Sequence, residues 1–125
     1  MILDTCALLW LASGGQKLSR ITLKEINEAP ALYVSAISGF EIARKTARGK
    51  LELPQPPAEW FARMMEHHGL TMLPLELDMC IRAACLPPIH NDPCDRFIIA
   101  AALLHDLPVV TTDERFAQYG VKVLS

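Results

Sequence analysis

Two neighbouring stretches of the chain decide its fold: DPCDRFIIAAALL at residues 92–104 and VVTTD at residues 109–113. The first opens with Asp-Pro, which suits the start of a helix, and continues as an apolar segment of helical length. The second is a short β-branched run that ends at a carboxylate. A buried helix followed closely by a buried strand predicts one unit of an alternating α/β fold.

The same alternation extends through the rest of the chain. Short β-rich runs predict five strands, at residues 1–4, 32–35, 70–75, 108–112 and 121–124. Helix signals mark residues 36–47, with Ser35 as cap and Gly49 as stop, and residues 57–68, which run from Pro57 to just before Gly69. Short strands without polar alternation are typical of a sheet covered on both faces. We therefore predict a single α/β domain over residues 1–125, a three-layer α/β/α sandwich with a central, mostly parallel sheet.

Composition and charge exclude several classes of protein. The chain has 125 residues, and its 51% of hydrophobic and 21% of charged residues exclude disorder as the main state. The longest apolar run, residues 97–104, is shorter than the roughly 18 residues of a membrane helix. The start lacks the basic region of a secretory signal. Because the formal net charge is −2, any surface that binds nucleic acid must be locally basic.

The four cysteines are Cys6, Cys80, Cys85 and Cys94, and none form a C-x-x-C pair. We interpret them as reduced cysteines of a cytoplasmic protein. A zinc site is the less favoured alternative, because the steps from Cys80 to Cys85 and on to His90 do not match the usual ligand spacing.

Four carboxylates fall where the predicted strands end or the predicted helices begin. Asp4 ends the first strand, and Asp113 ends the fourth. Glu41 lies about two turns into the helix after the second strand, and Asp95 lies in the first turn of the helix at residues 92–104. Ligands of open parallel sheets bind beyond the carboxyl ends of the strands. We therefore expect the four acids to meet on one rim of the sheet.

Each acid also has a purely structural interpretation. Asp4 and Asp113 are placed to cap the helices that follow them, and Glu41 precedes Lys45 by four residues, the spacing of a helical ion pair. Asp92 fits the N-cap of its helix, and the acid three positions later fits a capping box. Cap geometry accounts for Asp92 fully, so we treat it as a cap that supports the site.

Taken together, the four acids favour a metal centre. Two carboxylates about 4 Å apart repel by roughly 4 kcal/mol at an effective dielectric of 20. Several on one rim must raise their own pKa values or bind a cation. Mg²⁺ and Mn²⁺ prefer oxygen ligands, and in such a pocket they activate water and stabilise the leaving oxygen of a phosphodiester.

Four motifs follow one another along almost the whole chain: ILDT at residues 2–5, VSAISGFEIA at 34–43, HNDPCDRFIIAAA at 90–102 and VTTD at 110–113. With these motifs the chain resembles a PIN domain, in particular the VapC-type toxins of bacterial toxin–antitoxin systems. The D-P-x-D-R stretch is the most specific part. Cys6 is a departure, because relatives of this kind often carry His there.

The resemblance implies a Mg²⁺- or Mn²⁺-dependent endoribonuclease. Matched motif by motif, it assigns the acidic quartet of catalytic and metal-binding residues to Asp4, Glu41, Asp95 and Asp113. It makes Thr5 and Thr112 the hydroxyls that flank the quartet. It also implies a homodimer, and a small antitoxin protein that occupies the acidic groove, often with a basic side chain.

Basic residues cluster after Glu41, at Arg44, Lys45, Arg48 and Lys50. We interpret Arg44, Lys45 and Arg48, together with Arg96, as the residues that contact RNA phosphates. The alternatives are a solvated helix face for the cluster, and for Arg96 a role in holding a carboxylate. His90 is the histidine nearest the acids. We expect a loop histidine there, with a role as proton carrier as the lesser alternative.

Other classes of protein fit the acids less well or remain open. A receiver domain needs paired acids after the first strand, and a haloacid-dehalogenase-type phosphatase needs a second acid two residues after Asp4; the chain has neither. The open alternative is a metal- or RNA-binding module with little turnover that acts through partner binding, because a complete set of acids does not establish a rate.

Overall fold

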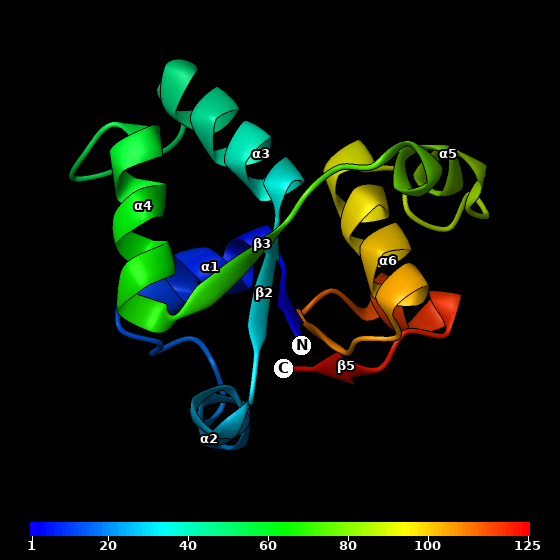
Figure 1. Ribbon diagram of the computed structural model, residues 1–125, viewed down its shortest axis with the longest axis horizontal. Coiled ribbons are helices and arrows are strands. Elements are labelled where there is room, and N and C mark those ends of the chain that lie inside the picture. The colour runs from blue at the N-terminus through cyan, green and yellow to red at the C-terminus, as the bar shows by residue number, and fades with distance from the viewer.

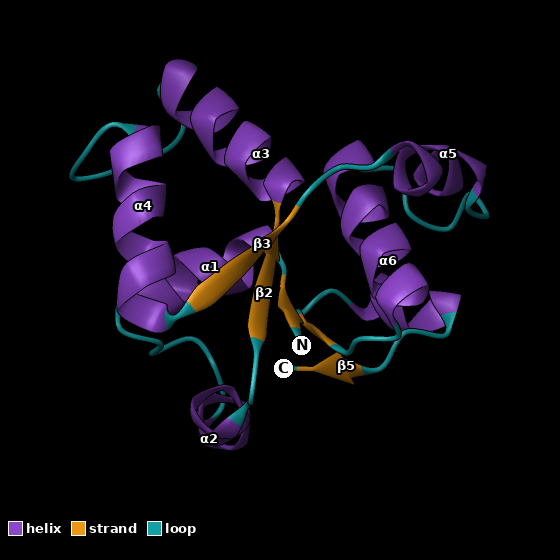
Figure 2. Ribbon diagram, viewed as in Figure 1, coloured by secondary structure: helices purple, strands orange, loops and turns teal.

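The computed structural model describes residues 1–125 as a five-stranded sheet with helices on both faces (Figures 1 and 2). The strands are β1 (Ile2–Leu3), β2 (Leu32–Ser35), β3 (Leu70–Leu73), β4 (Val109–Val110) and β5 (Val123–Leu124). They lie in the order β3-β2-β1-β4-β5, and every pairing is parallel. The predicted three-layer α/β/α architecture is confirmed. The sheet is wholly parallel, and most strands are shorter than their predicted ranges.

Helices connect the strands and cover both faces of the sheet. They are α1 (Thr5–Ala12), α2 (Arg20–Glu28), α3 (Ala36–Ala47), α4 (Pro57–His68), α5 (Leu77–Cys85), α6 (Pro93–His105) and the short 3₁₀ helix η1 (Glu114–Tyr119). The predicted boundaries of α3 and α4 are confirmed. The Ser35 hydroxyl accepts the N–H of Ile37, and α4 ends at Gly69 in the left-handed region, which glycine adopts without steric cost. None of these helices has both the length and the apolar composition needed to cross a membrane.

The sheet separates two apolar cores, because successive strand residues point to opposite faces. Ile2 and Val109 pack in the core under α5, α6 and η1. Leu3 and Val110 pack in the core under α1 and α4. All four side chains are fully buried, which explains why these strands are apolar without alternation.

The order of the strands places a crevice between β1 and β4. The chain winds from β1 outward to β3, then returns to add β4 and β5 on the other side of β1. The direction of winding therefore reverses between β1 and β4, and ligands of open α/β sheets bind at such a switch point. Asp4 directly follows β1, and its backbone N–H donates to the carbonyl of Val110 at the end of β4. The two strand ends that carry Asp4 and Asp113 are thus neighbours.

Candidate metal centre

Asp4 both caps α1 and belongs to the acid cluster. Its Oδ1 accepts the N–H of Ala7 at 2.7 Å, so the capping interpretation is confirmed. The residue is only 6% exposed. Burial is the main cause of a raised pKa of Asp4, and the charges of Glu41 and Asp113 raise it further. The cap therefore does not remove Asp4 from the influence of the other acids.

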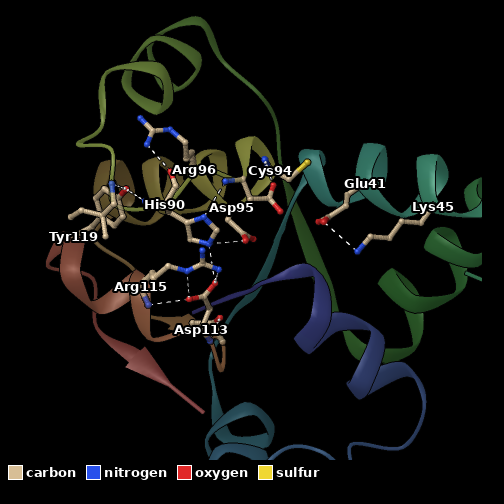
Figure 3. Close-up of polar contacts among 12 residues, drawn as sticks. Glu41, Lys45, His90, Cys94, Asp95, Arg96, Asp113, Arg115 and Tyr119 are labelled. Atoms are coloured by element: carbon tan, nitrogen blue, oxygen red, sulfur yellow. Dashed lines mark hydrogen bonds and ion pairs between the residues drawn. The ribbon is translucent and has the colours of Figure 1, made fainter. Parts of the chain in front are cut away.

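Glu41 extends from α3 toward the same space (Figure 3). Its Oε2 lies 3.4 Å from Lys45 Nζ, so the predicted i,i+4 ion pair is present. Its Oε1, however, is buried and has no hydrogen-bond partner. A buried carboxylate oxygen without a partner is costly unless something binds it. Glu41 Oε1 is therefore the atom of this rim that best fits a cation.

Asp95 and Asp113 both point to the Nε2 edge of the His90 imidazole (Figure 3). Asp95 comes from the first turn of α6, and Asp113 precedes η1. The Nε2 atom of His90 lies 3.0 Å from Asp95 Oδ2 and 2.9 Å from Asp113 Oδ2. Arg115 adds a bidentate contact to Asp113, from Nε to Oδ1 at 3.0 Å and from Nη2 to Oδ2 at 2.7 Å.

The two aspartates differ in how their charge is compensated. Burial raises the pKa of Asp95 to about 7, and repulsion from four neighbouring carboxylates adds to the effect. The Arg115 guanidinium instead holds the pKa of Asp113 well below its usual range. Asp95 is therefore the acid whose negative charge most lacks a partner, and a bound cation would favour its charged form.

The four predicted acids lie near enough to influence one another, although their ligand atoms fall into more than one group: Glu41 lies with Asp92 and Cys94, and Asp95 and Asp113 lie with His90. The charges of Asp4, Glu41 and Asp113 all raise the pKa of Asp95, although the four acids come from separate parts of the chain. Two cationic side chains form ion pairs with these four carboxylates: Lys45 pairs with Glu41, and Arg115 pairs with Asp113. The excess of negative charge and the unpartnered oxygen of Glu41 fit a divalent cation.

The donor atoms favour a hard cation over zinc. Cys94 lies close to Glu41 and Asp92, and the three could offer ligand atoms within 4.8 Å of one another. Burial raises the pKa of the Cys94 thiol to about 11, so the thiolate that zinc binds forms less readily here in the metal-free protein. A second group with ligand atoms within the same distance is His90, Asp95 and Asp113. Four of the six residues in the two groups offer carboxylate oxygens, which Mg²⁺ and Mn²⁺ prefer.

The model of the PIN domain family matches residues 1–122. This chain belongs to the PIN domain family. The ribonuclease VapC22 of Mycobacterium tuberculosis is 30% identical to this PIN domain over 120 residues, which are 95% of this chain and 91% of that relative. The resemblance predicted from the four motifs is confirmed.

Solved structures give the same result for the fold of the PIN domain. A toxin–antitoxin complex from Klebsiella pneumoniae contains a chain that is 25% identical, with a TM-score of 0.64 and coverage of 99% of this chain and 95% of that one. VapBC2 from Rickettsia felis, bound to a DNA fragment from its promoter, gives a TM-score of 0.71 at 12% identity, with coverage of 99% and 96%. The second likeness, at so low an identity, shows the fold alone.

The hydroxyls around the acids of the PIN domain differ in part from the prediction. Thr5 is buried and hydrogen-bonded to the Ser38 hydroxyl at 2.9 Å. Thr112 is exposed and makes no hydrogen bond to the acids. Its neighbour Thr111 is buried, and the Thr111 hydroxyl accepts the backbone N–H of Asp113 at 3.1 Å. Thr111 therefore takes the place predicted for Thr112.

Arg96 does not face the acids of the PIN domain. Its guanidinium donates five hydrogen bonds of 2.6 to 3.4 Å to carbonyl oxygens at and beyond the end of α5, those of Ala83, Ala84, Leu86, Pro87 and His90. A guanidinium has five N–H donors, and all are used. This corrects the expectation that Arg96 contacts RNA phosphates or holds a carboxylate. It connects α6 to the loop before it.

We expect Arg96→Ala to lower the free energy of unfolding by about 3 kcal/mol, because several charge-assisted hydrogen bonds are lost and carbonyls are left unpaired. Arg96→Lys should recover little of this loss, since one ammonium group cannot reach five carbonyls. Urea denaturation of the three proteins measures the difference. A loss below 1 kcal/mol for Arg96→Ala would show that the network contributes little to stability.

Beside the acids, the PIN domain has a groove of about 370 Å³ with a basic rim. Its lining includes Glu41 and four basic residues of α3 and the turn after it, Arg44, Lys45, Arg48 and Lys50. Asp92 lies on the opposite wall, where its carboxylate caps α6 through the N–H of Cys94, as predicted. Basic and acidic side chains thus share one groove.

Sequence reasoning missed several residues of the site. His90 is buried, with 1% of its surface exposed, and contacts two of the acids, contrary to the expected loop histidine. Ser38, Thr111 and Arg115 also contact site residues. Ser38, His90 and Thr111 stand within the quoted motifs, and Arg115 lies two residues after Asp113, but nothing in the sequence assigns them these contacts.

Proposed function

We propose that this PIN domain is a Mg²⁺- or Mn²⁺-dependent endoribonuclease that cleaves RNA phosphodiester bonds, and that it is the toxin of a VapBC-type toxin–antitoxin pair. The observation that carries the proposal is the proximity of Asp4, Glu41, Asp95 and Asp113, together with the unpartnered, buried carboxylate oxygen of Glu41. Support comes from the relative that is named a ribonuclease and from the neighbour in a toxin–antitoxin complex.

The four acids would hold the ion, and each has a distinct part. Glu41 offers Oε1, which no protein group occupies. Asp95 gains most from a cation, since its pKa is raised by burial and by like charges. Asp4 is fixed by its cap contact, and Asp113 is fixed by Arg115. When bound, the ion supplies activation of water and stabilises the charge that develops on the leaving oxygen.

The basic rim would align the RNA backbone beside the acids. We expect Arg44→Ala with Arg48→Ala to raise KM for RNA about tenfold with a much smaller effect on kcat, because these side chains bind phosphates in substrate and transition state alike. The dependence of log KM on log salt should also become shallower, by about 0.7 per lost contact with single-stranded RNA. Arg63→Ala on α4, which breaks only an exposed pair with Glu59, is the matched control. An unchanged KM and salt slope would place the RNA elsewhere.

The function is tested by incubating the purified chain with RNA and Mn²⁺, with and without EDTA. We expect internal cleavage with Mn²⁺ and none with EDTA. RNA that is bound but never cut would favour the alternative, a non-catalytic metal- or RNA-binding module. Expression without a partner should arrest growth of the host, and unimpaired growth with active protein present would argue against a toxin.

The partners follow from the same proposal. An antitoxin protein that enters the acidic groove is supported by the structural neighbours, which include toxin–antitoxin complexes. RNA is proposed as the substrate. The homodimer and the cytoplasmic location stay predictions from the family resemblance and from the reduced cysteines.

A further inference from the structure

We propose that His90 is a positioning residue of the metal centre. Its Nε2–H group is hydrogen-bonded to Asp113 and lies in close contact with Asp95, and so aligns these two carboxylates for a cation. The proposal rests on the metal-binding function proposed above. It assigns His90 a role as a hydrogen-bond donor to the ligands, and excludes it as a ligand itself.

The imidazole of His90 is held on all sides. The backbone N–H of His90 donates to the Tyr119 hydroxyl at 2.7 Å, and its carbonyl accepts from Arg96 at 3.0 Å. The ring packs edge-to-face on Phe116, with centroids 5.8 Å apart. Only 1% of the surface of His90 is exposed, and the contacts of Nδ1 with the Asp92 N–H and of Nε2 with Asp113 favour this ring orientation over the flipped one. The direction of its two nitrogens is therefore set by the fold.

The position of the ring proton follows from the contact at the other nitrogen. The backbone N–H of Asp92 points at His90 Nδ1 from 3.1 Å. A backbone amide can only donate, so Nδ1 must present its lone pair. A neutral imidazole carries one proton, which then lies on Nε2 and points between Asp95 Oδ2 and Asp113 Oδ2. Because Nε2 carries that proton, it has no lone pair for a metal ion.

One donor between two carboxylates has a direct consequence for the site. Like charges this close repel each other. His90 Nε2, which is hydrogen-bonded to Asp113 Oδ2 and lies 3.0 Å from Asp95 Oδ2, offsets part of that repulsion. No hydrogen bond of the protein engages the other oxygen of Asp95, Oδ1, which is left for the cation. Hydrogen-bonded partners of metal ligands commonly change metal affinity by 10–100-fold.

The test is Mn²⁺ binding to the full chain without RNA, measured by calorimetry. We expect His90→Phe, which keeps the ring packing but lacks the donor, to weaken Mn²⁺ binding about 10–100-fold. His90→Gln, whose amide N–H can reach the same carboxylates, should recover part of the loss. His105→Phe is the matched control, because His105 is exposed at the far end of α6. A purely structural role for His90 would lower the melting temperature but leave the affinity of the folded protein unchanged.

The outcomes separate this proposal from the proposed function. If wild type binds no Mn²⁺, the metal-binding function is wrong. If wild type binds and His90→Phe binds within twofold of it, only the role of His90 is overturned. A second measurement uses wild type alone, so it does not depend on how the variants fold. A long-range ¹⁵N NMR spectrum of the metal-free protein should show the His90 proton on Nε2, and a proton on Nδ1 would overturn the proposal.

Discussion

Asp95→Asn should reduce Mn²⁺-dependent cleavage of RNA by about 10³-fold or more. A bound divalent ion contributes several kcal/mol to stabilising the charge of the transition state, and each 1.36 kcal/mol is a factor of ten in rate. Asn has the same shape as Asp but supplies a neutral oxygen, so the ion is held weakly or not at all. Asp4→Asn should have a comparable effect, since Asp4 lies in the same cluster. Initial rates at saturating Mn²⁺ measure both losses.

The matched control for these variants is Asp106→Asn. Asp106 is exposed at the C-cap of α6, with a φ of 51° that Asn adopts readily. Asp106→Asn replaces an acid by an amide in the same way but away from the cluster, so the activity of this variant should equal that of wild type. Equal cutting by Asp95→Asn, Asp4→Asn and wild type would point to a contaminating nuclease and would contradict the assignment of the acids.

The metal-free protein should lose stability as the pH rises from about 4 to about 7. The pKa of Asp95 is about 7 in the folded state, against 3.8 in the absence of the fold. Between these values the folded state binds more protons than the unfolded state, so the free energy of unfolding falls with rising pH. The stability gained by keeping Asp95 protonated in the folded state is fully present below about pH 4 and lost above about pH 7. Because Asp95 is partly exposed, solvent screening reduces its contribution to an order of magnitude of a few kcal/mol at most.

Asp95→Asn isolates that contribution. In EDTA, the variant should match wild type in stability near pH 4 and exceed it at pH 8, by a few kcal/mol at most, because the charge that burial and the neighbouring carboxylates disfavour is gone. Urea denaturation at several pH values measures the difference between the two proteins. Mn²⁺ at pH 8 should stabilise wild type and leave the variant unchanged, since only wild type retains the full set of acids. Parallel pH profiles for the two proteins would show that Asp95 carries no uncompensated charge.

Much of the fold could be predicted because its signals are local. Ser35, Pro57 and Asp92 begin helices through contacts within a few residues, and the structure places each where the sequence does. The proximity of the acids was also predictable, since carboxyl ends of parallel strands lie at one edge. Asp4 and Glu41 show that the structural and functional interpretations need not compete. Asp4 caps α1, Glu41 pairs with Lys45, and both still face the cluster.

Other features depend on contacts between distant segments. Arg96 follows an acid directly, yet its side chain turns away to the carbonyls beyond α5, a segment that the sequence alone does not place next to it. Thr111 and Thr112 are adjacent, and only the end of β4 at Val110 decides which hydroxyl faces the acids. The burial of His90 depends on Tyr119 and Phe116, which lie more than 20 residues further along the chain.

The most direct test of the metal centre is a crystal structure of the protein grown with Mn²⁺, with the ion located by its anomalous scattering. We expect one or two peaks at the carboxyl ends of β1 and β4, within about 2.5 Å of carboxylate oxygens of Asp4, Asp95 and Glu41. Glu41 Oε1 should then have a partner. The opposite result is a well-ordered site without an anomalous peak, in which the acids contact only helix N–H groups, His90, Lys45 and Arg115. That result would show that the acids are structural and that the chain has no metal centre.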